Sequence, residues 1–189
     1  MSDGYERALR IHNRIKEIGV WIAGLDIVAI MLFICVDVIK RNITGSSIAG
    51  SYEIIQGYLM ALSTFTAIPY AYSVGVMPRV DLIVKKVKPE RQKIMVNTML
   101  VLDMIIFTIL TVISFQYALK GFANKTTFVA GTTYYPVYPF YLLAPVSFLL
   151  VIIEDIFVLI KNAKQNKADM YLGESMPKDI KQAASETVF

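Results

Sequence analysis

Residues 18–39 read IGVWIAGLDIVAIMLFICVDVI, an almost unbroken apolar stretch with two aspartates inside it. A helix needs about 20 apolar residues to cross the roughly 30 Å hydrocarbon core of a bilayer. The stretch is longer than the apolar part of a cleavable signal peptide and contains Asp26 and Asp37, so we interpret it as a retained transmembrane helix. Strands of a membrane barrel would instead alternate apolar and polar residues over about ten positions.

Three further apolar blocks follow the first, at about residues 54–76, 94–119 and 139–160. Hydrophobic residues make up 56% of the chain and charged residues 18%, with a mean hydropathy of +0.53. These features predict an all-α integral membrane protein with four transmembrane helices. We expect one membrane domain in residues 1–164 and a polar cytoplasmic tail in residues 165–189, which leaves no room for a soluble catalytic module.

The distribution of basic residues predicts the orientation of these helices, because loops rich in lysine and arginine stay cytoplasmic. Such residues concentrate before the first span, between the second and third, and after the fourth. The opposite side carries only Lys40, Arg41, Lys120 and Lys125. We therefore expect both termini in the cytoplasm. The net charge of +4 indicates contacts with lipid headgroups, and nucleic acid is not an expected partner.

The segment before the first span, residues 5–18, mixes leucine and isoleucine with arginine, lysine and glutamate. This pattern is typical of a short amphipathic helix lying on the membrane surface, so we predict such an interfacial helix at the N-terminus. The alternative is a charged N-terminal extension of the first transmembrane helix.

Three charged residues lie near the predicted outer ends of the first two spans. Asp37 and Arg41 are four residues apart on one helix and can pair, and Glu53 at the start of the second span can reach the same arginine. One interpretation is a polar knot that holds the two helix ends together. The other is a set of interfacial charges in contact with water.

A second group of ionisable residues is acidic only and lies about 10 Å inside the cytoplasmic helix ends, at 1.5 Å per residue. It comprises Asp26, Asp103, Glu154 and Asp155. Ionisable groups within a span are costly unless they are neutralised, solvated or paired. We expect no lysine or arginine of this chain at that depth, so the acids are protonated, bonded to hydroxyls such as Ser63 or Thr108, or matched by basic groups of another protein. An ion path through the chain would use the same residues.

The remaining chemistry is sparse. Cys35 is the single cysteine and His12 the single histidine, which excludes a cysteine metal cluster and a pair of axial haem ligands. No catalytic, cofactor-binding or metal-binding residues are predicted, and no cofactor. Small residues four apart, such as Gly19 and Ala23 or Gly57 and Ala61, favour close helix packing.

Three stretches resemble a known family. Arg41 follows the first span and Glu53 opens the second after a short loop, within Val38-Ile39-Lys40-Arg41-Asn42-Ile43-Thr44-Gly45-Ser46 and Ser51-Tyr52-Glu53-Ile54. After the second span, Gly75 is followed by a valine-aspartate-leucine run that contains Asp81. Before the fourth span, a proline and aromatic run contains Pro136, Pro139 and Pro145. Together these resemble the small, four-helix DctQ-type subunit of tripartite ATP-independent periplasmic (TRAP) transporters. Two positions depart from the family pattern, Asn42 after the arginine and Met77 to Arg79 before the valine-aspartate.

The resemblance implies a small, non-catalytic, multi-pass subunit in a bacterial inner membrane, where it braces a much larger permease subunit. The large subunit would use the sodium gradient to move an organic acid captured by a periplasmic solute-binding protein, so sodium coupling is expected there and not in this chain. Two alternatives stay open at this point: the small subunit of a tripartite tricarboxylate transporter, and the membrane anchor of an oxidoreductase.

Overall fold

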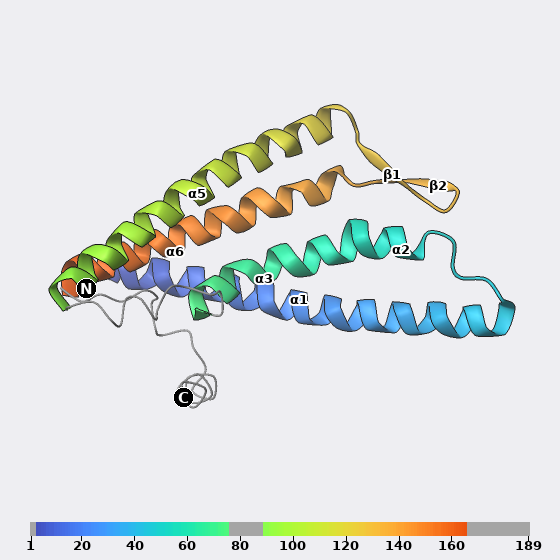
Figure 1. Cartoon of the computed structure of the whole chain (residues 1–189), viewed down its shortest axis with the longest axis horizontal. Helices are drawn as coiled ribbons and strands as arrows, with labels where there is room; N and C mark the ends of the chain where they lie inside the picture. The colour runs from blue at the N-terminus through green and yellow to red at the C-terminus, as the bar shows by residue number, and fades with distance from the viewer. Residues whose placement is uncertain (1–2, 76–88, 166–189) are drawn as a thin grey trace.

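The computed structural model of the chain describes residues 3–75 and 89–165. The long helices form two layers that lie close together at the N-terminal end and diverge toward a small β-hairpin (Figure 1). One layer contains α1, Asp3–Thr44, and α3, Met60–Val74, and the other contains α5, Pro89–Ala123, and α6, Leu143–Gln165. We call the two ends of the bundle the N-terminal end and the hairpin end.

Three of these helices are long and apolar enough to cross a membrane, at residues 5–44, 94–123 and 138–163 of the described chain. They include three of the four predicted spans, which confirms an α-helical membrane protein. The second predicted span, residues 54–76, corresponds to shorter pieces: α2, Ser51–Ile54, a π-helical turn at Ile55–Leu59, and α3, which follow each other directly. A fourth crossing stays a prediction.

The N-terminal segment is part of α1, which runs as one helix from Asp3 to Thr44. The prediction of a separate interfacial helix is therefore wrong, and the alternative of an N-terminal extension is correct. The reason is tertiary packing: Leu9 is buried in a cluster with Val96 and Leu100 of α5 and Val158 of α6. These contacts hold the first turns of α1 against the other layer.

The buried residues of α1 recur at alternating intervals of three and four, the spacing of a helix that packs along one seam. Leu9, His12, Lys16, Ala23 and Asp26 are all buried. Gly19 lies at the missing position of the series, and a Cβ there would be 2.6 Å from the carbonyl oxygen of Thr66 in α3. Close packing at Gly19 is thus confirmed, and Ile30, Phe33 and Asp37 continue the seam as partly buried residues.

The connection between α5 and α6 contains a β-hairpin that the sequence analysis does not predict. Strands β1, Thr127–Ala130, and β2, Thr133–Pro136, pair antiparallel with Thr127 opposite Pro136. The hairpin packs on the start of α2, where a Cβ on Gly50 would lie 2.6 Å from the backbone of Ala130. A 3₁₀ turn at Tyr138–Leu142 then leads into α6.

Candidate functional site: a buried polar cluster and a cavity under the hairpin

A buried ion pair joins the first third of α1 to the middle of α6. The Nζ atom of Lys16 donates a hydrogen bond to Oε2 of Glu154 at 2.6 Å, and Nε2 of His12 lies 2.9 Å from the same oxygen. His12 and Lys16 are four residues apart, so they present both nitrogens on one face of α1. The prediction that no basic residue of this chain reaches the acids is wrong for Glu154.

Tyr72 of α3 links the other two acids near this end. Its hydroxyl lies 2.6 Å from Oδ1 of Asp155 in α6 and 3.1 Å from Oδ2 of Asp103 in α5. Asp155 is fully buried, so this contact lies inside the bundle. Three helices therefore meet at one side chain. The predicted bonding of acids to hydroxyls is correct here, but the hydroxyl is a tyrosine, and Thr108 bonds its own helix at the carbonyl of Met104.

Asp26 lies on the same seam of α1 as Lys16, further toward the hairpin end. It interacts with Ser63 of α3, one of the two hydroxyl residues that the sequence analysis names. Its Oδ2 atom is buried without a hydrogen-bond partner. Together with the contacts above, all four predicted acids point into the bundle. Whether any of them also contacts another subunit stays a prediction.

The three charged residues at the hairpin end do not form the polar knot that was one of the two interpretations. Asp37 accepts a hydrogen bond from the backbone N–H of Ile48 at 2.6 Å and so holds the loop after α1. In residues 3–75 and 89–165, no ion pair joins Arg41 to Asp37 or to Glu53. Arg41 and Glu53 are exposed, which agrees with the alternative of interfacial charges.

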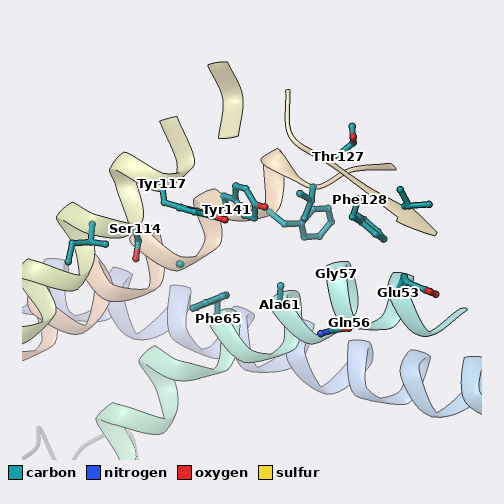
Figure 2. A pocket seen from close by; sticks show the side chains of 15 residues that line it. Glu53, Gln56, Gly57, Ala61, Phe65, Ser114, Tyr117, Thr127, Phe128 and Tyr141 are labelled. Atoms are coloured by element: carbon teal, nitrogen blue, oxygen red, sulfur yellow. The ribbon is translucent and has the colours of Figure 1, made fainter. Parts of the chain in front are cut away.

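A cavity of about 700 Å³ lies under the hairpin, between the two diverging layers. Its walls come from the start of the second helical segment, from α5 and α6, and from β1 (Figure 2). Phe65, Phe128, Phe140 and Ile113 provide apolar surface, and the polar groups on the lining are Glu53, Gln56, Ser114, Tyr117, Thr127 and Tyr141. Within the described residues, no group of three or more His, Cys, Asp or Glu side chains is placed to hold a metal.

Comparison with known proteins identifies the family. The family model described as "Tripartite ATP-independent periplasmic transporters, DctQ component" matches residues 30–164. The chain belongs to this family. The matched residues extend from the middle of α1 to the end of α6 and so include most of the bundle. Searches of the curated proteins and of the solved structures gave no match.

The motif residues that indicated the DctQ family have structural roles at the ends of helices and strands. Gly75 adopts a left-handed conformation with φ 76° and ends α3. The carbonyl of Pro136 accepts a hydrogen bond from the hydroxyl of Tyr58 at 2.8 Å. Pro139 lies in the first turn of the 3₁₀ helix, and Pro145 is buried in the first turn of α6. Asp81 lies outside the described residues.

Sequence reasoning missed the roles of His12, Lys16 and Tyr72 in this DctQ component. A signal for the first two is present in the sequence: His12, Lys16, Asp26 and Asp37 all fall on the three-and-four spacing that Leu9 and Ala23 also follow. In a helix that is apolar on every side, polar residues on one such line mark the face turned toward protein. For Tyr72 we find no comparable signal, because its partners come from two other helices.

Proposed function

We propose that this small TRAP transporter component is a non-catalytic subunit that braces the large permease subunit in a bacterial inner membrane. In this proposal the large subunit carries out sodium-driven uptake of an organic acid, which a periplasmic solute-binding protein delivers. Both termini of the small subunit lie in the cytoplasm. The family match supports the assignment to the transporter, and the structure supports a role as scaffold.

The scaffold role is supported by the buried polar side chains, which bind one another across helices of this chain. Lys16 and His12 bind Glu154, and Tyr72 contacts Asp103 and Asp155, so these side chains connect helices of this chain to each other. Hydrogen bonds between helices replace the hydrophobic driving force that is missing between apolar surfaces in lipid. A transport path would require such groups to line a route across the membrane.

The outer faces of the long helices are apolar and largely uncovered, which supports contact with an apolar partner. Only 11% of the most apolar stretch of α1 and 6% of that of α5 is buried within the chain. The uncovered residues include Leu25, Met31 and Ile43 on α1 and Ile105 and Ile109 on α5. Such surfaces suit lipid and the apolar helices of a larger membrane subunit.

The decisive experiment is co-expression of the chain with its large permease subunit, followed by co-purification, solute uptake and calorimetry. We expect a stable two-subunit complex that transports in proteoliposomes only together with the binding protein, and no saturable binding of the solute to the small subunit alone. Asp26→Asn tests the competing ion path, because asparagine keeps the shape and removes the charge. A variant that assembles normally but loses sodium-driven uptake contradicts the brace.

A further inference from the structure

The cavity under the hairpin has the dimensions of one leaflet of a bilayer. It extends from Glu53 in the first turn of α2 to Phe65 in α3, twelve residues of nearly continuous helix. At 1.5 Å per residue this corresponds to roughly 18 Å. Half of a hydrocarbon core of about 30 Å is about 15 Å. With the hairpin end at the level of the lipid headgroups, a cavity of this length extends to about the end of one acyl layer.

The lining changes character along this length. Away from the hairpin end the lining consists of Ala61, Phe65 and Ile113, side chains that suit a hydrocarbon chain, together with the hydroxyl of Ser114. The aromatic rings of Phe128 and Phe140 also line the cavity, and Figure 2 shows Phe128 reaching from β1 over Gly57. The lining is therefore mostly apolar around Phe65 and most polar around Glu53 and Gln56, a pattern that suits a molecule with an apolar tail and a polar head.

At the mouth of the cavity, Glu53 offers a negative charge that no basic residue of the described chain neutralises. Gln56, one turn further along, adds an amide that can bind a phosphate or ester oxygen. An acceptor for a cation and a donor for an anion therefore lie side by side at headgroup level.

We propose that this cavity binds one phospholipid with an ammonium headgroup. An acyl chain fills the space between the α3 and α5 walls, the ammonium group contacts Glu53, and the hairpin covers the glycerol region. An anionic lipid without an amine would place a negative phosphate near Glu53 with nothing to offset the repulsion, so the site discriminates by charge.

The test is native mass spectrometry of the two-subunit complex equilibrated in mixed micelles with equal amounts of phosphatidylethanolamine and phosphatidylglycerol. The wild-type complex is expected to retain phosphatidylethanolamine in preference. Glu53→Gln is expected to lower that preference about two- to fivefold, the effect of one solvent-accessible ion pair, while total lipid stays the same.

Two further variants fill the cavity from opposite walls, Ala61→Phe on α3 and Ser114→Phe on α5. Each is expected to bind one lipid fewer per complex. Met60→Phe is the matched control, because Met60 is the preceding residue on α3, is 54% exposed and does not line the cavity. Unchanged lipid counts in both filled variants, or equal retention of the two lipids by the wild type, would overturn the proposal.

A loss of the large subunit from the filled variants, with the lipid count unchanged, would show that a segment of the partner occupies the cavity, and this also contradicts the proposal. The lipid count and the uptake assay are separate measurements. A complex that assembles and transports normally but lacks the lipid therefore refutes this inference alone, and leaves the proposed function intact.

Discussion

Lys16 and Glu154 form an ion pair at 2.6 Å between α1 and α6, with side chains that are 1% and 2% exposed. The pair joins residues 138 positions apart in the chain. It closes the N-terminal end of the bundle, where the two layers meet, and makes the first turns of α1 part of the packed structure.

Removal of one member of this pair is expected to be strongly destabilising. Lys16→Met leaves Glu154 buried without the lysine charge, which costs about 3–5 kcal/mol of unfolding free energy. The double variant Lys16→Met with Glu154→Leu is expected to recover most of that loss, because no buried charge is left over. Thermal unfolding of the detergent-purified protein measures both. Arg14→Met, an exposed position on the same helix, is the control, and equal stability of Lys16→Met and Arg14→Met would contradict the prediction.

Tyr72→Phe is expected to destabilise the protein by about 1–3 kcal/mol, because Asp155 and Asp103 then lose a hydrogen-bond partner inside the bundle. Tyr70→Phe, two residues earlier on α3, is the matched control and should have little effect. The readout is the same thermal unfolding transition. If both variants unfold at the wild-type temperature, the hydroxyl of Tyr72 does not hold the three helices together.

Gly19→Ala and Gly24→Ala make the same change on one helix in two environments. A Cβ at Gly19 would lie 2.6 Å from the Thr66 carbonyl oxygen, whereas nothing lies within 4 Å of one at Gly24. We expect Gly19→Ala to separate α1 from α3 and lower stability, and Gly24→Ala to be neutral or stabilising by up to about 1 kcal/mol. Similar behaviour of the two variants would argue against close contact between the helices at Gly19.

Gly50→Ala tests how the hairpin packs on α2. Gly50 and Gly45 both have positive φ, 83° and 72°, so alanine at either costs about 1–2 kcal/mol. Only Gly50 would also place a Cβ against the backbone of Ala130. Cleavage after the exposed Lys125, which precedes β1, is therefore expected to be faster in Gly50→Ala than in Gly45→Ala. Equal cleavage rates would show that the hairpin does not depend on this contact.

The orientation is testable with fusions at chosen residues. Reporters placed after Lys167 should be cytoplasmic, and those after Ser46 or Lys125 should be periplasmic, because basic residues concentrate on the opposite side. The C-terminal ends of α1 and α5, which precede these positions, both lie at the hairpin end (Figure 1). An inverted pattern would refute the predicted topology.

Much of the fold could be predicted because long apolar stretches form helices in a membrane whatever their partners. The predicted stretches at residues 94–119 and 139–160 lie within α5 and within the apolar helix at residues 138–163. The predicted first span, residues 18–39, begins later in the chain than the observed helix, because α1 already begins at Asp3. Charges at Arg7, Arg10 and Arg14 resembled a surface helix, while the packing of Leu9 decided the outcome.

The polar contacts were harder to predict, because the depth of each residue in the membrane was counted from the end of its own helix. This counting placed Lys16 outside the membrane and Glu154 inside it, although an unbroken α1 brings both to the same level. The hairpin was missed because its strands have four residues each, too short for a clear alternation. Phe128, Val129, Tyr134 and Tyr135 around Gly131 were nevertheless a usable signal, as aromatic and β-branched residues favour strands.

The seam of α1 also defines how this helix is rotated about its own axis. An apolar side chain gains little by turning away from lipid, so most of the surface of α1 has no preferred direction. His12, Lys16, Asp26 and Asp37 do have one, and all lie on a single line. A one-residue insertion near Ala29 would turn Asp37 by about 100° relative to Lys16, whereas seven inserted residues would nearly realign them. Length changes in the middle of α1 therefore keep these side chains on one line only when they come close to a whole number of helical turns, such as about seven or about eleven residues, however apolar the added residues are.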